Sequence, residues 1–201
     1  MADGPLTAHR VAPASGQPVF YYDLGDPGCY LVAERIMAEL PMMPEWEPVH
    51  GARLGLTPSA PDRDALADAV DRHGLQPLRL PAAWPPDSEL AMLAATYAKG
   101  GGRAVAFSLA AFRQVFAGGR DLGDEATVLI AAAACEMHPT AVLKGVGMRS
   151  VRASLERAGE RARAAGVAEL PAIQSGAAMF QGEGALERAM DALEPAARPV
   201  R

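Results

Sequence analysis

The stretch from Phe20 to Arg35 reads FYYDLGDPGCYLVAER and decides how the chain folds. Residues 19–24 are apolar or aromatic on both faces, which predicts a short buried strand. A break follows, in which Asp26 occupies the position of a helix N-cap and Pro27 that of the first helical residue. Apolar residues then recur at a spacing of three and four, so we predict a helix over Cys29–Leu40. The stretch therefore predicts a strand, a tight loop and a helix.

The order of the later segments extends this beginning into a fold class. Residues 46–49 predict a second strand, which would pair parallel to the first because a helix connects the two. Two short apolar runs around Gly176 predict a hairpin near the end of the chain. The segments between are helical by their spacing. We therefore predict an α/β, thioredoxin-like fold with an all-helical insertion. Its parts are a flexible tail over residues 1–18, a thioredoxin-like domain over 19–53 and 151–193, and a helical insertion domain over 62–150.

Charge and composition exclude several classes of protein. The chain has 201 residues and a formal net charge of −5, which argues against a general nucleic-acid-binding surface. No apolar run approaches the roughly 20 residues of a membrane span, and the first residues lack the apolar segment of a secretory signal. We therefore expect a cytoplasmic protein without a membrane or nucleic-acid partner. Neither the four histidines nor the two cysteines have the spacing of metal ligands, so no metal is expected.

The loop before the predicted first helix is where a thioredoxin-like domain carries its reactive group. Unpaired backbone amides and the helix dipole stabilise a thiolate there. A dithiol enzyme needs cysteine at positions 26 and 29, and this chain has Asp26 and Cys29. Cys135 lies in an alanine-rich helical segment and is expected to be buried. The loop therefore cannot form an internal disulfide.

Three segments carry a resemblance to a known superfamily. FYYDLGDPGCYLVAER resembles the opening of DsbA-like proteins, and within them the branch of 2-hydroxychromene-2-carboxylate isomerases and kappa-class glutathione transferases. Residues 107–129, FSLAAFRQVFAGGRDLGDEATVL, resemble that branch's pair of insertion helices. Residues 166–171, GVAELP, are similar to the segment that leads to its cis-proline. The resemblance covers about residues 19–193.

The resemblance implies a function and a set of site residues. It implies a glutathione-linked isomerase or transferase that acts on a small apolar or aromatic ligand, with a homodimer as the possible assembly. It also implies a cis bond before Pro171, which would expose the preceding backbone to a peptide-like or thiol ligand. The expected pocket lies between the two domains. The candidate residues are Asp26 and Cys29 for catalysis, and Pro27, Gly28, Tyr30, Leu170 and Pro171 for binding of substrate or cofactor.

The chain departs from this branch at three places. The branch has serine where this chain has Asp26, and an ionised carboxylate cannot donate a hydrogen bond to a glutathione sulfur. Gly184 and Ala185 stand where the branch has an aspartate and an arginine that help to hold glutathione. The stretch over 49–61 is also shorter than the loop that covers the family's site. These departures predict a degenerate glutathione site.

Each candidate also has a structural interpretation. Cys29 is either a single nucleophilic thiol or a packing residue, and Asp26 is either a general base or only the N-cap. Tyr21, Tyr22 and Tyr30 suit a core better than a pocket. Two alternatives to the isomerase hypothesis therefore stay open. One is a monothiol thiol-disulfide oxidoreductase that uses Cys29, and the other is a non-catalytic binding or assembly protein.

Overall fold

A four-stranded mixed sheet forms the centre of the thioredoxin-like part. The computed structural model describes residues 16–194, so most of the predicted tail lies outside the described residues. Strands β1 (Val19–Tyr22) and β2 (Glu45–Pro48) pair parallel, as expected for a strand–helix–strand unit. Strand β3 (Ala172–Ser175) pairs antiparallel with both β1 and β4 (Ala178–Gln181), which gives the order β2-β1-β3-β4. The predicted fold class is confirmed.

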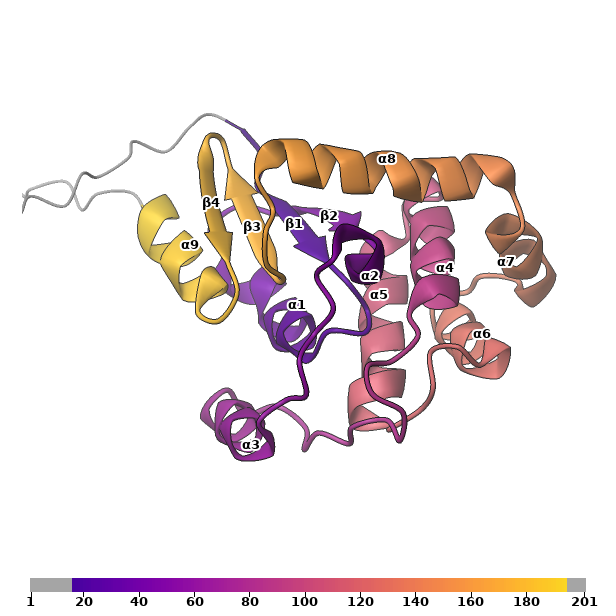
Figure 1. Cartoon of the computed structure of the whole chain (residues 1–201), viewed down its shortest axis with the longest axis horizontal. Helices are drawn as coiled ribbons and strands as arrows, with labels where there is room; N and C mark the ends of the chain where they lie inside the picture. Colours follow the sequence, from indigo (N-terminus) through magenta and orange to yellow (C-terminus); the bar gives the residue numbers. More distant parts are fainter. Residues whose placement is uncertain (1–15, 195–201) are drawn as a thin grey trace, which may run out of the picture.

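Helices pack around the sheet, and the helices of the insertion lie to one side of it (Figure 1). Helix α1 (Pro27–Glu39) contacts α9 (Ala185–Leu193), which packs against β3 and β4. Helix α8 (Arg149–Ala165) packs against β2 and continues over the insertion. The insertion contains α3 (Arg63–Arg72), α4 (Glu89–Gly100), α5 (Ala104–Phe112), α6 (Glu125–Ala134) and α7 (Pro139–Val146). All four strands lie in the segments predicted for the thioredoxin-like domain, whereas the division into domains stays a prediction.

Two short elements were not predicted from the sequence. Helix α2 (Gly51–Leu54) follows β2 directly, and its first amide donates to the buried carboxylate of Asp23 at 2.6 Å. Asp23 also accepts from the Gly25 amide at 2.8 Å, so one side chain joins the loop after β1 to α2. A π-helical turn, η1 (Arg113–Ala117), follows α5 directly, although the apolar spacing from Val105 to Phe116 fits one continuous α-helix.

An aromatic cluster joins the sheet to the insertion. The ring of Tyr22 lies 5.9 Å from that of Phe112, and the ring of Tyr30 lies 5.6 Å from that of Phe116. The Tyr22 hydroxyl forms a buried hydrogen bond with Ser108 Oγ at 2.6 Å. Aromatic pairs of this kind dominate the energetics of a core. The tyrosines of β1 and α1 therefore belong to the core, as their sequence context suggested.

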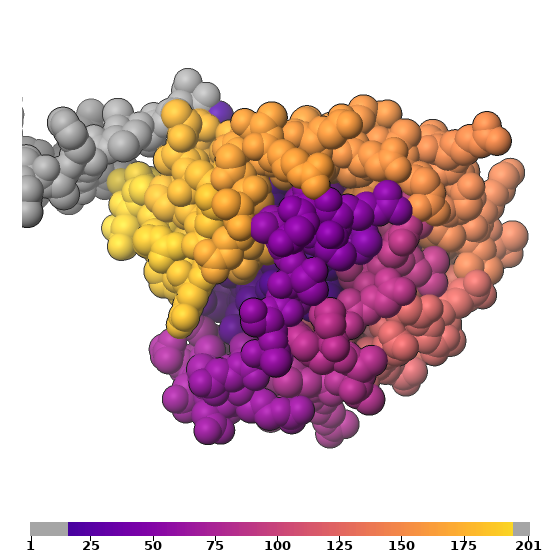
Figure 2. All heavy atoms as spheres, in the orientation of Figure 1, coloured from indigo at the N-terminus to yellow at the C-terminus, as the bar shows by residue number. Residues whose placement is uncertain are grey.

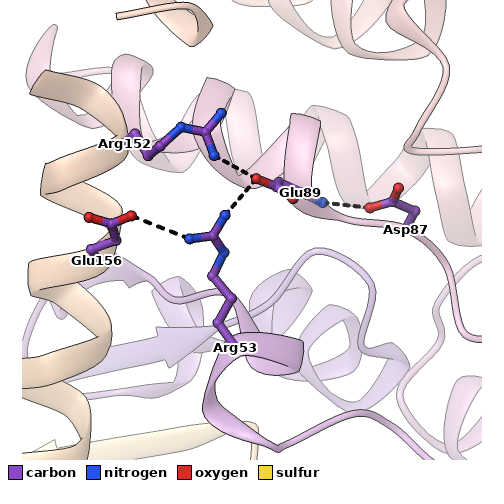
Figure 3. Close-up of polar contacts among 5 residues, drawn as sticks. All are labelled: Arg53, Asp87, Glu89, Arg152 and Glu156. Atoms are coloured by element: carbon purple, nitrogen blue, oxygen red, sulfur yellow. Dashed lines mark hydrogen bonds and ion pairs between the residues drawn. The ribbon is translucent and has the colours of Figure 1, made fainter. Parts of the chain in front are cut away.

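A surface ion-pair cluster ties α2 to α4 and α8 (Figure 3). Glu89 Oε1 accepts from Arg53 and from Arg152, both at 2.7 Å, and Arg53 also donates to Glu156 at 3.3 Å. The Asp87 carboxylate accepts from the Glu89 amide at 3.1 Å. In the sequence, glutamates interleave with the arginines of α8, a pattern that is typical of a solvated face with ion pairs. Because such pairs are exposed, each contributes little stability, but together they fix the orientation of α2.

Candidate functional site

A cleft of about 590 Å³ opens beside Pro171, and we call it the Pro171 cleft. Its apolar wall comes from α1, α3 and the residues before β3. That wall includes Gly28, Leu31, Leu66, Ala69, Leu170 and Pro171. The recess lies between the turn that precedes α9 and helix α3, drawn yellow and purple in Figure 2. The mostly apolar wall suits a small ligand with apolar surface.

Charged side chains stand around the apolar wall. They come from α1, from the ends of α3 and from the first turn of α9. These residues are Arg35, Asp62, Arg72, His73, Glu183 and Glu187. The cleft is therefore apolar at its base and charged at its rim.

The inner end of the Pro171 cleft is a close contact between the first turn of α1 and the proline. The Leu170–Pro171 bond is cis, as the resemblance implied. A Cβ built on Gly28 would lie 3.1 Å from Cδ of Pro171 and 3.1 Å from Oδ1 of Asp26. These distances are shorter than ordinary carbon contacts, so only glycine fits between the two groups without a shift. Gly28 therefore keeps the proline ring and the Asp26 carboxyl next to each other.

Asp26 is the N-cap of α1, as predicted. Its Oδ1 accepts from the Cys29 amide at 2.8 Å, and its side chain is buried with the residue only 8% exposed. Burial raises the pKa of Asp26 to about 6, although hydrogen bonds from the α1 backbone oppose the increase. A carboxyl group with such a pKa exchanges protons near neutral pH. Asp26 can therefore both cap α1 and exchange a proton.

Cys29 lies on the core side of the same helical turn. It is 0% exposed, and burial raises the pKa of its thiol well above the ordinary value, with the Asp26 charge adding to the increase. A thiol in this state is protonated and unreactive at neutral pH. The second cysteine, Cys135, is also buried, at the C-terminal end of α6. These positions favour a packing role for Cys29 over a nucleophilic one.

The remaining candidates divide between the cleft and the core. Leu170 and Pro171 line the cleft, as does Gly28. Tyr30, expected to bind ligand, is only 2% exposed and packs on Phe116 in the aromatic cluster. Pro27 is a buried residue of the first helical turn. The cleft itself lies beside α1, with α3 as one wall.

Arg35 and Glu187 line the cleft and were not predicted from the sequence. Arg35 Nη2 donates to Glu187 at 2.8 Å and to Glu39 at 2.8 Å, and its Nε donates to Glu39 at 2.9 Å. The Arg35 side chain is only 10% exposed. The sequence held one signal, since Arg35 lies seven residues after Gly28 and so on the same face of α1. Its partner on α9 is 152 residues away, and nothing in the sequence pairs the two.

Comparisons with solved structures support the fold described above. The structure of a 2-hydroxychromene-2-carboxylate isomerase is similar, with a TM-score of 0.77 and 17% sequence identity over 89% of this chain and 94% of that one. The oxidoreductase DsbA of Xylella fastidiosa aligns with a TM-score of 0.59 and 14% identity over 90% of this chain and 87% of that one. DsbA of Pseudomonas aeruginosa aligns with a TM-score of 0.56 and 14% identity over 90% and 83% of the two chains.

This chain has the DsbA-like thioredoxin fold. No family profile matches its sequence, and no curated protein matches it either. Within the DsbA-like fold, the loop before α1 has Asp26 and Cys29 where a dithiol pair would have two cysteines.

Two other features are absent from the described part of the chain. Over residues 16–194, no three side chains of histidine, cysteine, aspartate or glutamate are placed to hold a metal ion. No helix within that range is both long and apolar enough to cross a membrane.

Proposed function

We propose that this chain is an isomerase-type enzyme that binds a small apolar or aromatic molecule in the Pro171 cleft. In this proposal Asp26 moves a proton between two carbon atoms of the ligand. The observation that carries the proposal is the buried Asp26 carboxyl beside Gly28 and Pro171, with a pKa raised to about 6. A general base is most efficient when its pKa lies near the working pH.

The proposed reaction needs only groups of this chain. The ionised Asp26 takes a proton from a carbon next to a ligand carbonyl, and the electrons of that C–H bond move onto the carbonyl oxygen. The Leu170 amide donates no hydrogen bond to any described residue, so it is a donor available to that oxygen. The ligand carries a β,γ double bond, so this step gives a dienolate. As the electron pair moves back from the oxygen, the double bond shifts to the α,β position and Asp26 returns the proton to the γ carbon. The apolar wall formed by Leu31 and Leu66 orients the ligand and excludes water.

Hydrogen exchange of an uncharged aromatic ketone tests this proposal. With 2-tetralone in D₂O, the wild-type protein is expected to exchange the protons next to the carbonyl faster than buffer alone. The rate should increase with pH as Asp26 ionises near pH 6 and then level off. Asp26→Asn keeps the N-cap but not the base, so it should reduce exchange to the buffer rate, as measured by proton NMR.

A matched variant separates the base from the cap. Asp62 caps α3 and lines the Pro171 cleft, whereas Asp26 lies behind Gly28 and Pro171, so Asp62→Asn makes the same chemical change at a different N-cap. We expect Asp62→Asn to exchange the ketone at the wild-type rate. Equal exchange by wild-type protein and Asp26→Asn would refute the role of Asp26. Binding of 2-tetralone without any exchange would instead support the non-catalytic alternative.

The compound that names the similar isomerase provides a second test. Conversion of 2-hydroxychromene-2-carboxylate can be followed by absorbance, with and without glutathione. Turnover that requires glutathione would support the glutathione-linked activity that the resemblance implies. Turnover without glutathione that is lost in Asp26→Asn would support the carboxyl mechanism proposed here, and it would also show that the cleft admits a carboxylate.

A further inference from the structure

Three helices begin at the Pro171 cleft. Helix α1 presents Gly28 in its first turn, α3 presents its N-cap Asp62, and α9 presents Gly184 with Glu187 in its first turn. The first turn of a helix has unpaired amides and the positive end of the helix dipole. Anions commonly bind there. A cleft at three such ends would ordinarily suit an anionic ligand.

A carboxylate of the chain itself already occupies each of these positions. Asp26 accepts from the Cys29 amide at 2.8 Å at the start of α1. Asp62 accepts from two amides of α3 at 3.0 and 3.2 Å. At α9 no side chain caps the first turn, and the Ala185 amide donates to the Gly182 carbonyl at 3.1 Å. Glu187 lies in that turn; partial burial opposes a decrease of its pKa, but the α9 backbone and Arg35 lower it. A ligand carboxylate would therefore meet a carboxylate of the chain at each of the three helix starts.

The cations at the cleft are also committed. Arg35 is the most buried of them, and its guanidinium is shared between Glu39 and Glu187. Partial burial and the charge of Arg35 lower the pKa of His73, so its ring is neutral at pH 7. Acidic side chains then outnumber cationic ones around the cleft, with Asp62, Glu183 and Glu187 against Arg35 and Arg72. The charges around the cleft therefore oppose an anion.

We infer that the Pro171 cleft takes ligands without a carboxylate, and that Glu187 is the residue that excludes ligands carrying one. This inference rests on the proposed function, because it names the ligand class of the same cleft. Glutathione, which the resemblance implies, carries two carboxylates and a net negative charge at neutral pH. Glutathione in the cleft would face the Glu187–Arg35 pair at α9 and the Asp26 side chain at α1, which accepts hydrogen bonds. The residues present therefore do not fit glutathione.

Calorimetry with two probes tests the inference. Reduced glutathione is the anionic probe and 2-naphthol the uncharged aromatic probe. Wild-type protein should bind 2-naphthol and show no saturable heat with millimolar glutathione. Glu187→Ala removes this negative charge and leaves Arg35 paired only with Glu39, so its affinity for glutathione should rise at least about tenfold, as expected for a new charge-assisted contact. Its affinity for 2-naphthol should stay within about twofold, because the apolar wall is unchanged.

The control is a glutamate with the same exposure on another surface. The side chain of Glu156 is 49% exposed and paired with Arg53, and that of Glu187 is 48% exposed and paired with Arg35. Glu156→Ala should therefore bind both probes like the wild type (Figure 3). Glu187→Gln, which keeps the size of the side chain, should also gain glutathione binding, and melting curves check that each variant is folded.

The outcomes separate this inference from the proposed function. Tight glutathione binding by the wild type, or no gain in folded Glu187→Ala, overturns the role of Glu187. A gain in glutathione affinity together with no 2-naphthol binding by any variant supports the role of Glu187. That same result counts against the apolar ligand of the proposed function.

Discussion

The first turns of α1 and α9 face the same cleft, and a carboxyl group of the chain lies at each, yet the two groups have opposite properties. Asp26 is buried, forms no ion pair among the described residues, and has a pKa raised to about 6. Glu187 is half-exposed and paired with Arg35, and its pKa is lowered. The comparison shows that burial and the nearest cation decide the role of a carboxyl group at the start of a helix. Asp26 can exchange a proton, whereas Glu187 is a fixed charge.

The largest expected effect concerns the reactivity of Cys29, in the first turn of α1. In a Cys135→Ser background, iodoacetamide at pH 7.5 should label the native protein at least about a thousandfold more slowly than the unfolded protein. The reason is that Cys29 is fully buried and its thiol is protonated, so labelling needs local opening of α1. Mass spectrometry measures the rate. Rapid labelling of the folded protein would show that α1 holds a thiolate and would restore the monothiol alternative.

Asp26→Asn should stabilise the protein at high pH by about 3 kcal/mol, since the folded pKa of about 6 exceeds the ordinary aspartate pKa of 3.8. Below about pH 3 the carboxyl is protonated in both states, so the two proteins should be equally stable. Between pH 4 and 6 only the unfolded wild type loses the proton, so its stability falls as the pH rises and levels off above pH 6. Urea unfolding at several pH values measures the difference. A constant difference across pH 4–8 would contradict the raised pKa.

Gly28→Ala places a methyl group between Asp26 and Pro171. The contacts of 3.1 Å on both sides predict a destabilisation of about 1–3 kcal/mol and weaker binding of 2-naphthol. Gly100 also lies in a helix, but a Cβ there would have no atom within 4 Å, so Gly100→Ala is the matched control. Gly100→Ala should not reduce stability or binding. Equal behaviour of the two variants in thermal melts and titrations would show that the α1–Pro171 contact is not tight.

Glu187→Gln gives the smallest expected change in stability. Because Glu187 is half-exposed, loss of its pair with Arg35 should cost less than about 1 kcal/mol. Most of that cost should disappear in 1 M salt, where exposed charges are screened within about 3 Å. Thermal melts at low and high salt measure both values. A loss that salt does not change would mean that Glu187 acts through packing and not as a fixed charge.

The fold was predictable from the sequence because its signals are local. The apolar strand, the Asp26 cap and Pro27 fix the start of α1 as predicted, and the hairpin strands coincide with the predicted residues. The π-helical turn η1 was not predicted, because it depends on packing around Phe112 and Phe116. The pattern of apolar residues there fits a continuous helix equally well.

The site was predictable only where one helical face decides it. Residues at a given spacing on α1 share a face, so Gly28 and Arg35 face the cleft while Cys29 and Tyr30 face the core. The resemblance marked the loop as a whole and could not separate these two faces. The pairing of Arg35 with Glu187 depends on how α9 packs beside α1, which is tertiary information. The charges that define the ligand were therefore absent from the sequence prediction.

Helix α3 is a wall of the Pro171 cleft with only one buried residue, Val70, and irregular segments on both sides of it. In the proposed function the carboxyl that exchanges a proton lies on a different segment, the buried start of α1. Under that proposal, ligand recognition and proton chemistry are located on separate segments of the chain. Replacing residues 63–72 alone should then change which ligand fits while the proposed proton chemistry is retained.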